Sequence, residues 1–133
     1  MVERASPKRI ALVADDDPLI ARVLSAALEM DGWTVITAAD GATTVSAIAG
    51  HPLDLCIMDR FMPGPSLEIR LAELRRHRPA AAVIMLSGSH DETGVPEGAV
   101  VLRKPVGLDE LREGIARAGA LAAGSPTTAI AAT

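Results

Sequence analysis

The stretch of residues 53–58 constrains the fold more than any other part of this chain, because a nearly continuous apolar run ends there on a carboxylate, Asp59. Such a run is typical of a parallel strand that is buried on both faces. A loop that contains Pro63 and Gly64 follows at once. Open α/β sheets bind their ligands beyond the carboxyl ends of their strands. The stretch therefore predicts a buried strand that presents Asp59 at the ligand-binding edge of a sheet.

Four more apolar runs alternate with segments of helical periodicity. The five strands are expected at residues 10–14, 33–37, 53–59, 81–86 and 99–102. Helices are expected at residues 18–31, 41–50 and 67–78, and from residue 108 onward, whereas the polar residues 89–98 hold at most one helical turn. Strands and helices that alternate at short spacing predict an α/β fold, in which helices cover a parallel sheet and the crossovers are right-handed.

The first and third helices have expected N-caps and expected apolar faces. Asp17 before Pro18 is typical of an N-cap, and Ser66 is the expected N-cap of the third helix. The apolar face of the first helix is predicted to consist of Leu19, Ile20, Val23, Leu24, Ala27 and Leu28. In the third helix we expect Leu67, Leu71 and Leu74 to point inward, and Glu68, Arg70, Glu73, Arg75 and Arg76 to point outward.

The composition limits the functions that are open to the chain. Trp33 and Phe61 are the only aromatic residues and the net charge is -4, so base stacking and binding to a phosphate backbone are both disfavoured. The single cysteine, Cys56, lies inside the buried strand, as expected of an inert thiol in a reducing compartment. No signal peptide or membrane span is evident. We expect a cytoplasmic protein with an N-terminal extension at 1–8, one domain at 9–120 and a flexible tail at 121–133.

Four of the expected strands end on chemically active residues. These residues are Asp15 and Asp16 after the first strand, Asp59 after the third, Ser87 after the fourth and Lys104 after the fifth. The carboxyl ends of parallel strands lie along one edge, so these side chains can meet in one crevice. Carboxylates this close repel one another unless a cation lies among them, and oxygen ligands favour Mg²⁺. A metal, an ammonium and a hydroxyl beside a carboxylate suit the transfer of a phosphoryl group.

Four short motifs stand at these strand ends. They are Ala14-Asp15-Asp16-Asp17-Pro18, Met58-Asp59-Arg60-Phe61-Met62-Pro63-Gly64, Ser87-Gly88 and Lys104-Pro105. Together, and in this order, they resemble the signature of the receiver domain of two-component response regulators. The resemblance implies a doubly wound, five-stranded parallel sheet of flavodoxin-like order 2-1-3-4-5, with a fourth helix that is shortened or missing in this chain.

The resemblance also implies a role for each acidic residue. Asp59 would be the phosphoacceptor, taking a phosphoryl group from a phosphohistidine. Mg²⁺ would be held by Asp16, Asp59 and the backbone carbonyl of Phe61, with Asp15 helping through water. Asp17 is expected to cap the first helix rather than to bind the metal.

Ser87 and Lys104 would contact the aspartyl phosphate, and the resemblance implies a cis peptide bond between Lys104 and Pro105. Other positions depart from the family pattern. Val101 stands three residues before Lys104, where the family usually carries Tyr or Phe. The loop after Met62 is one residue short, and the span from Ser87 to Lys104 is also short. The receiving chemistry is therefore expected to be intact, whereas the usual output surface is altered.

The sequence predicts a phosphoacceptor receiver domain of a phosphorelay, with no output domain of its own and no enzymatic activity beyond self-phosphorylation and slow self-dephosphorylation. The expected partner is a histidine kinase or a histidine phosphotransfer protein, with no nucleic acid, no membrane, and a monomer or weak dimer. Val101, the shortened region of the fourth helix and the short loop motivate an alternative, a pseudo-receiver that binds proteins independently of phosphorylation. A third class, a Mg²⁺-dependent hydrolase, would need a general acid that Arg60 and Phe61 do not supply.

Overall fold

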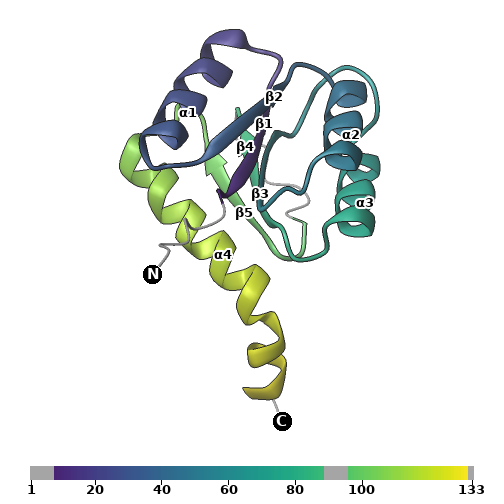
Figure 1. Cartoon of the computed structure of the whole chain (residues 1–133), viewed down its shortest axis with the longest axis vertical. Helices are drawn as coiled ribbons and strands as arrows, with labels where there is room; N and C mark the ends of the chain where they lie inside the picture. Colours follow the sequence, from purple (N-terminus) through teal and green to yellow (C-terminus); the bar gives the residue numbers. More distant parts are fainter. Residues whose placement is uncertain (1–7, 89–95, 132–133) are drawn as a thin grey trace, which may run out of the picture.

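Five parallel strands form one sheet in the order β2-β1-β3-β4-β5 (Figure 1). The computed structural model describes residues 8–88 and 96–131, with side chains as far as Gly124. The strands are β1 (Ile10–Ala14), β2 (Thr34–Ala38), β3 (Leu55–Asp59), β4 (Ala82–Ser87) and β5 (Ala99–Arg103). The class and the strand order that the sequence predicted are therefore confirmed.

Strand β3 lies at the centre of the sheet, and all five of its residues are buried. Ile57 is in register with Val13 of β1 on one side and with Ile84 of β4 on the other. Within β3, Cys56 is a free and fully buried thiol, and burial raises its pKa to about 12. The apolar run that predicted a strand covered on both faces is thus the middle strand of the sheet.

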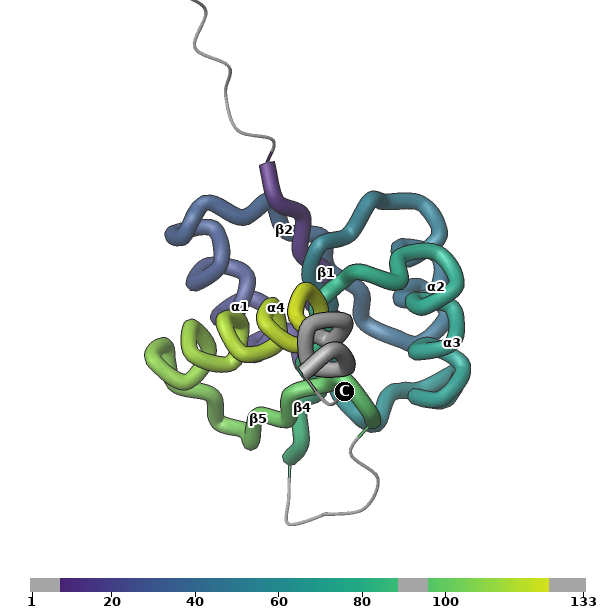
Figure 2. The backbone as a smooth tube through the Cα atoms, turned by 90° about the horizontal axis from the view of Figure 1, so that it is seen from below, coloured from purple at the N-terminus to yellow at the C-terminus, as the bar shows by residue number. Residues whose placement is uncertain are grey.

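Within the described residues, α1 and α4 cover one face of the sheet and α2 and α3 cover the other, and Figure 2 shows this arrangement from below. The helices are α1 (Pro18–Met30), α2 (Gly41–Gly50), α3 (Leu67–His77) and α4 (Leu108–Ala131). One core lies under α1 and α4 and contains Val13, Ile57 and Ile84, and the other lies under α2 and α3 and contains Leu12, Cys56 and Met58. Successive strand residues therefore point to opposite cores, so the sheet is buried on both sides.

The helices start at the residues that the sequence predicted as caps. The Asp17 carboxylate accepts hydrogen bonds from the backbone N–H groups of Leu19 and Ile20, and Pro18 is the first helical residue. Ser66 Oγ accepts the backbone N–H of Ile69 at 3.3 Å at the start of α3. These caps fix where the loops after β1 and β3 end, and therefore how long the loops beside the site are.

Two predictions about the helix faces were wrong. Leu19 and Val23 were expected to be buried, but they are 65% and 54% exposed, because the sheet covers only the narrower stripe that contains Leu24 and Leu28. Arg70 was expected to point outward, but it is 1% exposed. A charged side chain is rarely buried without partners, so Arg70 must find them inside the protein.

The last helix extends beyond the expected boundary. α4 runs to Ala131 and projects past the sheet in Figure 1, whereas the composition after Gly119 had suggested a tail. Whether residues 121–133 are flexible stays a prediction. Most of the segment expected to hold a shortened or missing helix, residues 89–95, lies outside the described residues. Within the described ranges, no helix combines the length and apolar composition that crossing a bilayer requires.

Candidate functional site

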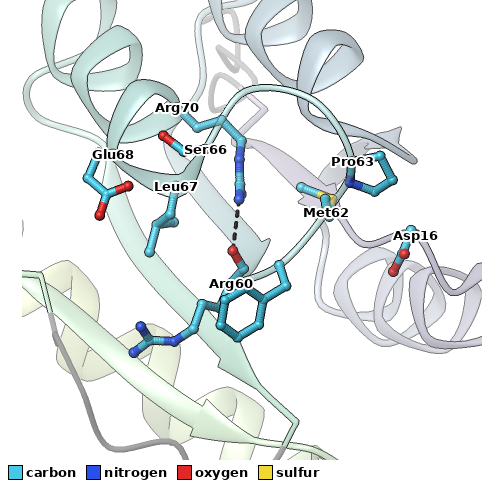
Figure 3. Close-up of a pocket in the computed structure, with 9 residues that line it drawn as sticks. Asp16, Arg60, Met62, Pro63, Ser66, Leu67, Glu68 and Arg70 are labelled. Carbon is cyan, nitrogen blue, oxygen red and sulfur yellow. Dashed lines mark hydrogen bonds between the residues drawn. The ribbon is translucent and has the colours of Figure 1, made fainter.

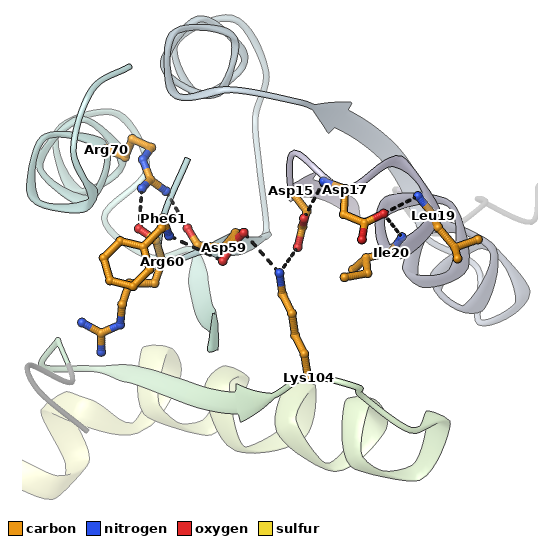
Figure 4. A network of polar contacts seen from close by, with 9 residues as sticks. All are labelled: Asp15, Asp17, Leu19, Ile20, Asp59, Arg60, Phe61, Arg70 and Lys104. Atoms are coloured by element: carbon orange, nitrogen blue, oxygen red, sulfur yellow. Dashed lines mark hydrogen bonds and ion pairs between the residues drawn. The ribbon is translucent and has the colours of Figure 1, made fainter. Parts of the chain in front are cut away.

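Three carboxylates meet at the carboxyl edge of the sheet, and Figure 4 draws two of them, those of Asp15 and Asp59. Asp15 and Asp16 directly follow β1, and Asp59 is the last residue of the neighbouring strand β3. One carboxylate oxygen from each of the three lies within 4.8 Å of the others. Asp15 and Asp59 are buried, with 1% and 8% of their surface exposed, whereas Asp16 is exposed. The convergence that parallel topology predicted therefore occurs.

Lys104 inserts its ammonium between two of these carboxylates. Its Nζ lies 2.9 Å from Asp15 Oδ2 and 3.2 Å from Asp59 Oδ2 (Figure 4). Lys104 follows β5 directly, and its backbone N–H donates to the carbonyl of Ser87 at the end of β4. The peptide bond between Lys104 and Pro105 is cis, as the resemblance implied. The end of β5 thus supplies an ammonium that pairs with the carboxylates at the ends of β1 and β3.

The electrostatics of the site are dominated by burial. Burial raises the pKa of Asp59, the nearby Asp15 carboxylate raises it further, and the Lys104 ammonium only partly offsets both. Burial alone would lower the pKa of Lys104, but its contacts with Asp15 and Asp59 reverse this and raise it. The site therefore contains more buried negative charge than one ammonium neutralises, which is the condition under which a further cation is favoured.

The donor set fits a hard divalent cation. Asp15 Oδ2 is buried and, within the described part of the chain, accepts no hydrogen bond of good geometry, although the Lys104 ammonium lies beside it. Its other oxygen, Oδ1, accepts the backbone N–H of Asp17 at 2.8 Å. The Lys104 ammonium that faces this oxygen is shared with Asp59, so it neutralises only part of the charge of the three clustered carboxylates. Carboxylate oxygens without thiol or imidazole ligands suit Mg²⁺ better than a soft metal.

Replacement of Asp59 by asparagine is expected to raise the free energy of unfolding by about 1 kcal/mol at pH 7 in metal-free buffer. A pKa that is raised by folding adds stability below the pKa of the unfolded chain, and that stability is lost as the pH rises through the folded pKa. At neutral pH the wild type therefore carries a buried charge that the amide lacks. Urea unfolding, followed by Trp33 fluorescence, measures the difference.

The same difference should shrink as the pH falls toward the pKa of an unperturbed aspartate, because the wild-type carboxyl then becomes neutral as well. An asparagine variant that is less stable than the wild type at pH 7 would contradict this account of Asp59.

Ser87 and Phe61 flank the acidic cluster. Ser87 is buried at the end of β4, one residue after Leu86, which is in register with Asp59. The backbone N–H of Phe61 donates to Asp59 Oδ1 at 3.5 Å, while the Phe61 side chain is 68% exposed. A pocket of about 450 Å³ opens next to it, between Asp16 and the first turn of α3 (Figure 3). The residues that the sequence assigned to metal and phosphoryl binding thus lie at one edge of the sheet.

Arg70 is the site residue that the sequence analysis missed. Its guanidinium donates to the backbone carbonyls of Asp59 and Arg60, each at 2.9 Å (Figure 4), and Figure 3 also shows the bond to Arg60. A signal was available, because residue 70 stands three positions after Leu67 and four before Leu74, on the inward stripe of α3. Its charge led to the outward assignment.

Sequence comparison shows the same family along most of the chain. The family model of the response regulator receiver domain matches residues 11–116. The transcriptional regulatory protein TcrA of Mycobacterium tuberculosis is 39% identical over 113 residues, which cover 81% of this chain and 44% of the relative. The transcriptional regulatory protein KdpE of the same organism is 39% identical over 106 residues, which cover 76% and 46%. The chain therefore spans less than half the length of these curated relatives.

Solved structures agree with the fold. A receiver domain protein from Clostridium thermocellum is 32% identical with a TM-score of 0.71, and the match covers 84% of this chain and 94% of that one. A CheY-like receiver domain protein from Methanospirillum hungatei, at 23% identity, shares the fold with a TM-score of 0.77 over 90% of this chain and 99% of that one. With the sequence match and the cluster of Asp15, Asp16 and Asp59, these likenesses lead to one conclusion. The chain belongs to the response regulator receiver domain family.

Proposed function

We propose that this chain is a phosphoacceptor module of a two-component or phosphorelay system, in which Asp59 takes a phosphoryl group from a phosphohistidine. The observation that carries the proposal is the meeting of Asp15, Asp16 and Asp59 with Lys104, since residues remote in the sequence build one acidic site with one cation. The donor would be a histidine kinase or a histidine phosphotransfer protein, which are the partners of receiver domains.

The transfer would proceed by a simple exchange of bonds. A carboxylate oxygen of Asp59 forms a bond to phosphorus while the bond between phosphorus and the histidine nitrogen breaks, and the electron pair leaves with the imidazole. The Lys104 ammonium, already within 3.2 Å of Asp59 Oδ2, would neutralise a phosphoryl oxygen. Ser87, buried at the adjacent strand end, would donate a hydrogen bond to another.

A divalent cation would complete the charge balance. Asp16, Asp59 and the backbone carbonyl of Phe61 would hold Mg²⁺, with Asp15 contributing through water. The ion would supply positive charge to the phosphoryl oxygens during transfer. The three clustered carboxylates, whose charge one ammonium neutralises only in part, support this placement.

A small phosphodonor tests the proposal. Acetyl phosphate with Mg²⁺ is expected to add one phosphoryl group to the intact protein, as measured by mass spectrometry, and Asp59→Ala should abolish the addition. Glu29→Ala is a matched control, because Glu29 is an exposed carboxylate on α1, and this variant should be phosphorylated like the wild type. An unchanged mass of the folded wild type under saturating donor would refute the function.

The half-buried Val101 on β5 favours a second candidate, a pseudo-receiver that acts as a protein-interaction module. A rotating aromatic ring cannot report phosphorylation from this position. This candidate predicts that partner binding is indifferent to Mg²⁺, to phosphate mimics and to Asp59→Asn, whereas the phosphoacceptor proposal predicts sensitivity to all three. Four expectations stay predictions: that the protein has no output domain, that it binds no nucleic acid, that it has no further catalytic activity, and that it is cytoplasmic.

A further inference from the structure

Arg70 is a buried cation that forms no ion pair with any residue that the structure describes. It is 1% exposed, and within residues 8–88 and 96–131 no carboxylate lies within ion-pairing distance of its guanidinium. Leaving a charge in the interior is costly unless hydrogen bonds compensate for the lost water. The groups that accept hydrogen bonds from Arg70 are all neutral, while the Asp59 and Glu68 carboxylates attract it without direct contact, so the accepting groups must explain why it is buried.

Apart from the Met58 thioether, which accepts Nη1 at 3.7 Å, those groups are backbone carbonyls at the end of β3 and in the loop that leads to α3. Nη1 donates to the Asp59 carbonyl and Nη2 to the Arg60 carbonyl, each at 2.9 Å, and Nε donates to the Pro65 carbonyl at 3.1 Å. The planar guanidinium has its donors in a fixed fork, so the three carbonyls are held in one arrangement. Arg70 thus joins the beginning of the loop to its end.

The contact with Arg60 reaches the acidic site through one peptide group. The carbonyl of Arg60 and the N–H of Phe61 belong to the same planar trans peptide, in which they point in opposite directions. Arg70 Nη2 draws the carbonyl toward α3, and the N–H on the other side donates to Asp59 Oδ1 at 3.5 Å (Figure 4). The guanidinium therefore sets the orientation of a donor to the phosphoacceptor carboxylate.

The far side of the loop is fixed as well. The N–H of Gly41, at the start of α2, donates to the carbonyl of Pro63 at 2.7 Å. A β-carbon at Gly41 would lie 2.7 Å from the carbonyl oxygen of Pro65, so the loop packs on α2 more closely than a side chain would allow. The short loop is thus held between α2 on one side and Arg70 on the other. These contacts fix the positions of Asp59 and Phe61.

We propose that Arg70 is a positioning residue of the acidic site, which holds the carbonyls of Asp59 and Arg60 so that the Asp59 carboxylate and the Phe61 backbone face the cation together. The inference rests on the proposed function and names a residue that the function did not use. Outer-shell groups that orient metal ligands are typically worth 10- to 100-fold in metal affinity. A purely structural arginine would change the stability of the fold but not the affinity of the folded protein for Mg²⁺.

Phe61 gives a direct probe, because it is the only phenylalanine in the chain. Labelling with carbonyl-¹³C phenylalanine yields one carbonyl signal in the NMR spectrum, at the residue whose carbonyl is assigned to the cation. Titration of the full chain with magnesium chloride then gives a dissociation constant without any phosphodonor. Urea unfolding by Trp33 fluorescence, performed in parallel, shows that each variant is folded under the titration conditions.

Arg70→Met is expected to weaken Mg²⁺ binding about tenfold or more while the folded protein retains its Trp33 signal. Arg78→Met is the matched control, because Arg78 Nε also donates to a backbone carbonyl, that of Leu53, but beyond the opposite end of β3. The control should bind Mg²⁺ like the wild type.

Equal affinity of Arg70→Met and the wild type would overturn the inference and leave the proposed function intact. If Arg70→Met does not fold, Arg70→Lys decides, since lysine keeps the charge but cannot reproduce the three-carbonyl fork. Arg70→Lys is expected to bind Mg²⁺ at least about threefold more weakly, and unchanged affinity would again overturn the inference. A wild type that neither binds Mg²⁺ nor accepts a phosphoryl group would refute the proposed function, and the inference with it.

Discussion

Replacement of Lys104 by methionine is expected to lower the free energy of unfolding by about 3 kcal/mol in metal-free buffer. The substitution leaves the carboxylates of Asp15 and Asp59 facing each other without the ammonium that now lies 2.9 Å and 3.2 Å from them. The side chains of Asp15 and Asp59 are 0% and 11% exposed, so water would compensate for little of the lost attraction. Urea unfolding at pH 7 with a chelator measures the loss.

Two companion variants locate the origin of that loss. Arg103→Met, at the exposed neighbouring position, should cost far less, and Asp59→Asn in the Lys104→Met background should recover much of the stability by removing one of the two opposed charges. Because the pKa of Lys104 is raised, its contribution should be complete at pH 7 and disappear only above the pKa of an ordinary lysine. A cost below about 1 kcal/mol, or no recovery by Asp59→Asn, would contradict the charge balance assigned to the site.

Replacement of Ile57 by alanine is expected to cost about 3 kcal/mol of stability. Ile57 is 0% exposed on the central strand and packs in the core under α1 and α4, so the truncation leaves a cavity that the strands on both sides cannot close. Thermal or urea unfolding measures the loss directly.

Val101→Ala on the edge strand β5 provides the contrast. Val101 is only half-buried, so its truncation should cost about 1 kcal/mol. The folded fraction of either variant should still accept a phosphoryl group, because neither side chain is assigned to the site. Equal costs for the two truncations would show that stability is not concentrated in the central strands.

The sequence predicted the positions of the strands because the buried runs consist almost entirely of apolar residues and end on polar or charged ones. Runs such as residues 55–58 and 82–86 can only lie between two layers of helices, and parallel strands bring all their carboxyl ends to one edge. The sequence alone therefore places Asp15, Asp59 and Lys104 together. The caps Asp17 and Ser66 were predictable for a similar reason, since capping depends on a few neighbouring residues.

What the sequence did not reveal depends on contacts between distant segments. Arg70 donates to backbone carbonyls, and such contacts leave no pattern in the sequence. Its charge therefore led to the prediction that it points outward, although its position lies on the inward stripe of α3. Leu19 and Val23 fit the helical period, but the width of the buried stripe is set by the sheet and by α4. The extent of α4 was underestimated because alanine was treated as tail composition, although it has the highest helix propensity.

The site of phosphorylation is the most direct test of the account. Sodium borohydride reduces an aspartyl phosphate to homoserine, which survives proteolysis and can be located by peptide mass spectrometry. After treatment of the wild type with acetyl phosphate and Mg²⁺, we predict homoserine at position 59 and none at positions 15 and 16, because Asp59 ends the central strand beside Ser87 and Lys104, the residues assigned to the phosphoryl oxygens. Homoserine at position 15 or 16, or at no position under saturating donor, would contradict the central claim that Asp59 is the phosphoacceptor.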